Sequence, residues 1–125
     1  GTHARTIGLG EQTFGERVLH VAQVNAGLLR LLGGKAAAPT IPAAATTKAA
    51  AIKAMDDSFD YGLALIKEQT DQTMLQAVAN PPPSLGPSSR ARVITGLMGH
   101  TWDIYGQLAV YLRLAGRVPP ASARP

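Results

Sequence analysis

The chain has 125 residues, a length typical of one domain, and 46% of them are hydrophobic. It contains no cysteine, which excludes a disulfide scaffold, a cysteine nucleophile, a thiolate zinc site and an iron–sulfur cluster. The net charge is +4, but no two Lys or Arg residues are adjacent, so a nucleic-acid partner, which needs a stripe of cations, is not expected. No apolar run reaches the roughly 20 residues that a membrane span requires.

The first predicted helix spans residues 13–32. Thr13 and Glu16 have the spacing of an N-terminal capping box, and Gly33 and Gly34 end the segment as a C-cap pair. One arc at 3.6-residue spacing carries the apolar side chains and one asparagine: Phe14, Val18, Val21, Ala22, Asn25, Leu28, Leu29 and Leu32.

The second predicted helix spans residues 47–78, after a proline-containing linker over residues 35–45. Thr46 or Thr47 can cap its start, and Asn80 with the three prolines that follow stops it. The residues expected to face the core are Ile52, Met55, Phe59, Leu63, Ile66, Thr70, Thr73 and Ala77. Asp56, Asp57 and Asp60 lie in mid-helix without the glycine turn of a calcium loop, so we interpret them as a solvated face.

The third predicted helix spans residues 89–114, with Ser88 or Ser89 as its N-cap and Gly116 as its C-cap. No alternating strand pattern competes with the three helices. We therefore predict a single all-α domain over residues 1–125, built as an up-and-down bundle.

Each helix has an unusually wide apolar arc. This pattern indicates that a further helix packs against the three, either from another subunit or from a segment that precedes this sequence. Trp102 and Tyr105 point away from the centre of their arc and are candidates for a dimer contact.

Three histidines are the candidates for chemistry. His3 lies in the irregular opening segment and is expected to be solvated, whereas His20 and His100 lie along the apolar arcs of the first and third helices. A histidine on such an arc is commonly a hydrogen-bonded boundary residue. Two of them on different helices could instead meet across a bundle and share a metal.

Two segments resemble a known family. HTWDIYGQLAVYLRLAGRVPP at 100–120 looks like the last helix of the DinB-like bacterial proteins, and TFGERVLHVAQVNA at 13–26 resembles their second helix. With the middle helix, the resemblance covers about residues 11–122. It implies a four-helix bundle, often dimeric, whose first helix is absent from this sequence or supplied from elsewhere, and a bacterial protein of the cytoplasm or periplasm.

The same resemblance implies a divalent metal, Zn or Ni, held by three histidines. One ligand position matches His20, the second matches His100, and the third, four residues later, falls on Ile104, which cannot bind a metal. Asp103 or Gln107 could substitute, but the helical angle turns Asp103 outward and Gln107 is a weak neutral ligand. We therefore expect no tightly bound metal.

Two functions remain open at this point. The first is a bundle with a degenerate metal site that acts as a structural protein or holds a small molecule, in a pocket formed by Val24, Ile104, Gln107 and Tyr111. The second is a metal-dependent enzyme of the thiol-transferase or hydrolase type, in which the ion activates a thiol or water. The DinB-like resemblance implies a homodimer for either of these two functions.

Overall fold

The computed structural model describes residues 12–123, so the interpretation of His3 lies outside the described residues. Its elements are α1 (Phe14–Leu29), the 3₁₀ turn η1 (Arg30–Leu32), α2 (Lys48–Lys67), α3 (Asp71–Met74), α4 (Arg90–Leu114) and the 3₁₀ turn η2 (Pro120–Ser122). Within residues 12–123 there is no strand, only an isolated bridge between Ala77 and Ser89. The all-α prediction is confirmed.

The predicted starts of all three long helices are confirmed by their caps. Thr13 and Glu16 form the capping box of α1, and the side chains of Thr47 and Ser89 accept backbone N–H bonds at the starts of α2 and α4. Gly33 ends the first helical segment with a φ of 62°. Local side-chain chemistry therefore determines where each long helix begins.

The predicted extent of the second helix, to residue 78, is wrong. The α2 helix ends at Lys67, because Thr70 adopts an extended conformation and exchanges capping hydrogen bonds with Thr73. The two threonine hydroxyls accept backbone N–H groups and so offer the backbone an alternative to continuing the helix. They start the separate short helix α3, which leads the chain toward α4.

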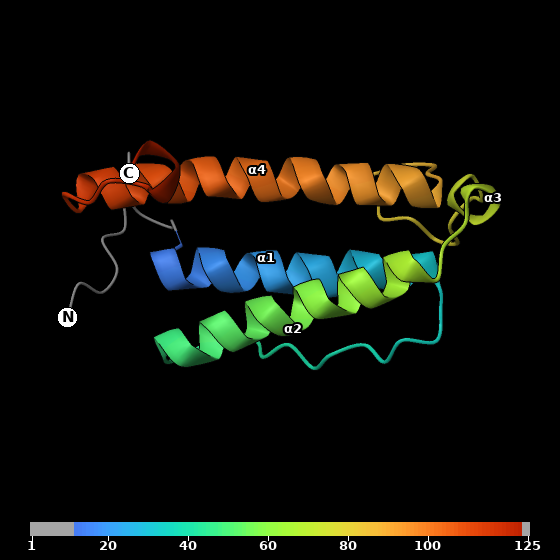
Figure 1. Ribbon diagram of the computed structural model, residues 1–125, viewed down its shortest axis with the longest axis horizontal. Helices are drawn as coiled ribbons and strands as arrows, with labels where there is room; N and C mark the ends of the chain where they lie inside the picture. The colour runs from blue at the N-terminus through green and yellow to red at the C-terminus, as the bar shows by residue number, and fades with distance from the viewer. Residues whose placement is uncertain (1–11, 124–125) are drawn as a thin grey trace.

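The predicted up-and-down topology is wrong, because α1 and α2 run parallel to each other (Figure 1). Residues 33–47 extended reach about 50 Å, more than the roughly 30 Å of a 20-residue helix. The linker starts beside the end of α2, where Glu68 accepts the N–H groups of Lys35 and Ala36. It then passes α1, where Gln23 donates to the carbonyl of Pro42, and reaches the start of α2.

The face that α2 buries is also different from the predicted one. Its buried residues are Ala51, Ala54, Ser58, Tyr61, Gly62 and Leu65. The large side chains of the predicted arc, including Phe59, Leu63 and Ile66, are exposed. Small residues let α1 approach closely: a Cβ on Gly62 would lie 3.0 Å from a methyl group of Leu29.

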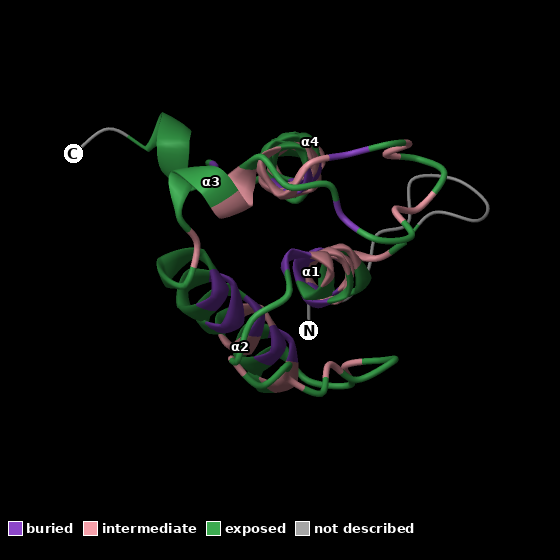
Figure 2. Ribbon diagram, turned by 90° about the vertical axis from the view of Figure 1, so that its right-hand side faces the viewer, coloured by how far each residue is buried: buried purple, intermediate pink, exposed green. Residues whose placement is uncertain are grey.

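The α1 helix forms the centre of the molecule and packs against both α2 and α4 (Figure 2). The main core cluster consists of Leu29, Leu32, Tyr61, Leu65, Val78, Val93 and Leu97, and a smaller cluster joins Leu19, Ala22 and Ala54. Only three residues of α4 are buried: Val93, Leu97 and Ile104. The α4 helix is therefore held by few contacts and leaves most of its surface uncovered.

Leu65 tests this assignment of the buried face. It is 1% exposed, so Leu65→Ala is expected to lower the free energy of unfolding by about 2–5 kcal/mol, through lost burial and the cavity left behind. Urea unfolding followed by circular dichroism measures the change. Leu75→Ala is the matched control, since Leu75 is 78% exposed and should change stability by less than about 0.5 kcal/mol. Equal losses for the two variants would contradict the buried face described here.

Candidate functional site

The structure brings together the two histidines that the sequence analysis singled out. His20 lies on α1 and His100 on α4, and their Nε2 atoms are 3.1 Å apart. The ring centroids are 5.0 Å apart and the planes are inclined by 61°. This separation fits a hydrogen bond in which one ring donates and the other accepts, so the two rings adopt complementary tautomers.

Burial lowers the pKa of His100, and the neighbouring His20 lowers it further, while Asp103 acts in the opposite direction. The Nδ1 atom of His100 is buried and has no hydrogen-bond partner among residues 12–123. In protein metal sites, the histidine ring nitrogen that does not bind the metal commonly donates to a carboxylate or carbonyl, which orients the ring. His100 has no such support from the described residues.

The third metal-ligand position that the DinB-like resemblance implies is occupied by a buried side chain. Ile104 is 2% exposed, one turn along α4 from His100. The two proposed substitutes bind each other instead, since Gln107 donates to the carboxylate of Asp103 at 2.9 Å. Among the described residues no group of three or more His, Cys, Asp or Glu side chains could hold a metal ion.

A second buried side-chain nitrogen lies on α1. Arg17 is one turn before His20 on α1, and its Nε atom is buried without a hydrogen-bond partner in the described part of the chain.

The residues predicted to line a pocket have other contacts. Val24 packs against the main core cluster, and the hydroxyl of Tyr111 donates to the carbonyl of Gln12. None of Val24, Ile104, Gln107 and Tyr111 lines the main apolar groove.

That groove runs between α2 and α4, with α1 as its floor, and encloses about 320 Å³. Its lining residues are Asn25, Leu29, Ser58, Phe59, Gly62, Leu63, Ile66, Ile94, Leu97, Met98, Thr101 and Trp102. In its floor, buried Asn25 donates to Ser58, which in turn donates to the carbonyl of Met55. The sequence analysis missed this groove because it assigned the large residues of α2 to the core.

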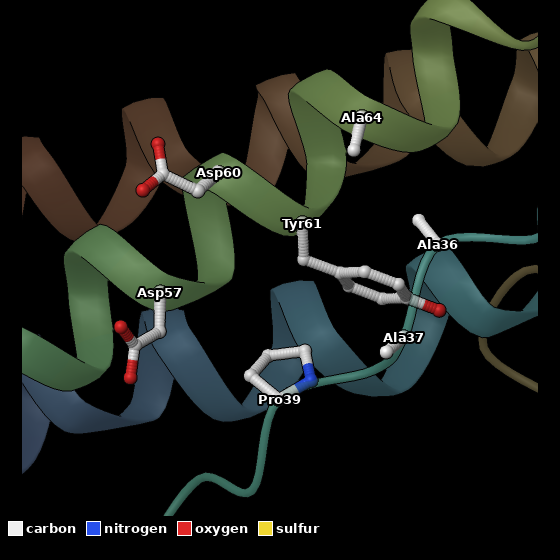
Figure 3. A pocket seen from close by; sticks show the side chains of 7 residues that line it. All are labelled: Ala36, Ala37, Pro39, Asp57, Asp60, Tyr61 and Ala64. Atoms are coloured by element: carbon white, nitrogen blue, oxygen red, sulfur yellow. The ribbon is translucent and has the colours of Figure 1, made fainter.

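A second concavity lies between α2 and the linker (Figure 3). The ring of Tyr61 extends from α2 toward Ala36, Ala37 and Pro39, while the carboxylates of Asp57 and Asp60 point away from it. Lys53 forms an ion pair with Asp57 at 2.7 Å, as expected for a solvated helix face. This concavity therefore lies where the linker meets α2. Its lining side chains do not form a convergent set of hydrogen-bond donors.

Comparisons of the chain with family models, curated proteins and solved structures find no match. The DinB-like resemblance therefore stays a prediction. None of the helices in the described range combines the length and the apolar character that crossing a membrane requires.

The histidine pair predicts how stability depends on pH. The pKa of folded His100 is lowered, so below the unfolded value of about 6.5 the unfolded chain binds more protons. The free energy of unfolding should therefore decrease as the pH falls from about 7 toward the lowered folded value. Urea midpoints measured across this range with a chelator present report the change. In His100→Gln this part of the pH dependence should be absent, and an unchanged profile in that variant would contradict the assignment.

Proposed function

We propose that this chain is a DinB-like helical bundle with a degenerate, two-imidazole metal site, and that it acts as a binding or structural protein. The observation that carries the proposal is the pairing of His20 and His100 at 3.1 Å beside a buried Ile104. Two imidazoles without a third ligand hold a zinc or nickel ion weakly, since protein sites for these metals commonly use three or four ligands.

The distance between the two histidine nitrogens favours a second candidate, a metal-dependent transferase or hydrolase. Two nitrogens bound to one tetrahedral zinc at about 2.0–2.1 Å lie roughly 3.3 Å from each other, close to the observed separation. This activity requires a third donor to complete the site. Asp103 is exposed and engaged with Gln107, so it would have to leave that hydrogen bond and turn inward.

Metal content separates the two candidates. The purified protein, loaded with zinc or nickel and then desalted, is expected to retain well under one equivalent by elemental analysis. Ile104→His should raise retention toward one equivalent by completing a three-histidine set. Val110→His is the matched control, because it adds a histidine at an exposed position on the same helix, six residues beyond Ile104.

Ile104 is buried, so a histidine there could impair folding. Ile104→Cys offers a smaller ligand, and circular dichroism shows whether each variant keeps its helices. A stoichiometric metal retained by the unaltered protein, and lost in both His20→Ala and His100→Ala, would overturn the degenerate-site proposal in favour of the enzyme. Folded Ile104→His and Ile104→Cys variants that both take up no more metal than Val110→His would also contradict it.

A further inference from the structure

The first half of the linker between α1 and α2 is held to the helices by few contacts. Residues 34–40 belong to no helix or strand, and none of them is buried. No backbone–backbone hydrogen bond joins residues 34–46 to another residue of the described range. Segments with so few buried contacts and backbone hydrogen bonds are the ones that open locally at low cost in free energy.

One side chain supplies the polar contacts at the start of this segment. Glu68 follows the last residue of α2, and its two carboxylate oxygens accept the N–H groups of Lys35 and Ala36 at 2.7 and 3.1 Å. Hydrogen bonds to a charged acceptor are stronger than neutral ones. Glu68 is itself exposed, so water competes for the same carboxylate. The closed position of residues 34–40 therefore depends largely on one exposed side chain.

The backbone at Gly34 allows this carboxylate to approach. Its φ is 139°, which L side chains rarely adopt. A Cβ atom at this position would lie 2.8 Å from a carboxylate oxygen of Glu68 and 2.6 Å from a methyl group of Leu65. A glycine is therefore required for residues 34–36 to lie against the end of α2.

The second half of the linker has contacts of a different kind. The side chain of Gln23 on α1 donates to the carbonyls of Pro42 and Ala43 at 2.9 and 3.3 Å. Ile41 and Ala45 pack against the smaller core cluster. This half is thus held by both polar and apolar contacts, and the boundary between the two halves lies near residue 41.

The first half covers the ring of Tyr61 (Figure 3). Tyr61 is 8% exposed, and its ring extends from α2 toward Ala36, Ala37 and Pro39. Ala36 also packs against the main core cluster, to which Tyr61 belongs. Movement of residues 34–40 away from α2 would uncover this ring and leave the contact between Gly62 and α1 in place.

We propose that residues 34–40 form a strap that opens without unfolding of the helices, that Glu68 holds this strap closed, and that the peptide bond between Lys35 and Ala36 is a protease site controlled by the Glu68 contact. The N–H of Ala36 belongs to that peptide bond, and the N–H of Lys35 belongs to the one before it. A protein that binds an extended peptide uses such backbone groups for its own hydrogen bonds. The bonds to Glu68 must therefore break before cleavage.

The sequence makes this site distinctive for an endoprotease that cuts after lysine. The chain has four lysines, of which Lys48, Lys53 and Lys67 lie in α2 and Lys35 lies outside any helix. The side chain of Lys35 is exposed, and three alanines follow it. Exposed loops are the preferred places for proteolytic cleavage, whereas a bond within a packed helix requires unfolding first.

Digestion of the folded protein with a lysine-specific endoprotease, followed by mass spectrometry, tests the proposal. The first cut is expected after Lys35. Glu68→Ala should speed this cut at least about tenfold, the factor equivalent to one charge-assisted hydrogen bond, and Glu68→Gln, which keeps one acceptor, should have a smaller effect. The matched control is Asp60→Asn, which neutralises an exposed carboxylate of α2 while the two amide groups stay bound to Glu68.

Gly34→Ala gives an independent test, since it leaves the carboxylate of Glu68 in place and obstructs its approach. It should speed the cut after Lys35 as Glu68→Ala does, and the double variant should be cut no faster than the faster single variant, because both changes break the same contact. Gly86→Ala is the control. Gly86 also has a positive φ, of 60°, but a Cβ atom there would meet no atom within 4 Å.

Val93→Ala separates opening of the strap from unfolding of the whole domain. Val93 on α4 is 0% exposed, so this change should lower the urea midpoint, yet it should leave the rate of the cut after Lys35 nearly unchanged. Hydrogen exchange adds a second measurement. In Glu68→Ala the amides of Lys35 and Ala36 should exchange faster, while those in the middle of α2 should not.

Four outcomes would overturn the proposal. They are a folded chain that is not cut after Lys35, a first cut within α2, equal acceleration by Glu68→Ala and Asp60→Asn, and a rate that rises in Val93→Ala as much as in Glu68→Ala. The contacts that hold the strap involve neither His20 nor His100, so these outcomes leave the metal-site proposal unaffected.

Discussion

The close contact between α1 and the small-residue face of α2 is the constraint on which the rest of the structure depends. Gly62 and Ser58 bring the two helices together, and Leu29 fills the space above Gly62. Larger side chains at these positions would separate the helices. With this face of α2 turned toward α1, Phe59, Leu63 and Ile66 face outward, and the groove along α2 follows from this rotation.

Local signals in the sequence were sufficient to predict the long helices and their starts. The capping box at Thr13, the caps at Thr47 and Ser89, and the glycine at position 33 each act within a few residues, so they can be recognised without knowledge of the fold. The end of α2 was missed because Thr70 and Thr73 continue the helical period, while their hydroxyls form a capping box that starts α3.

The face buried by α2 and the direction of the linker could not be obtained in this way. Periodicity identifies the most apolar face of a helix, and that face is the one exposed here, since α1 selects the partner surface that allows the closest approach. The meeting of His20 and His100 was predictable, because both lie on apolar arcs of neighbouring helices. The contact of Tyr111 with the carbonyl of Gln12 depends on details of packing that no spacing rule contains. The hydrogen bond between Gln107 and Asp103, in contrast, is an i, i+4 pair on one helix that spacing alone suggests.

Ile104 links the chemistry of the histidine pair to the packing of α4. It is one of only three buried residues of that helix, so its side chain contributes to holding α4 against α1 and keeps His100 opposite His20. A histidine at this position would exchange hydrocarbon packing for a polar ring that needs a metal or another partner to satisfy its nitrogens. Packing and metal binding thus compete for the same position.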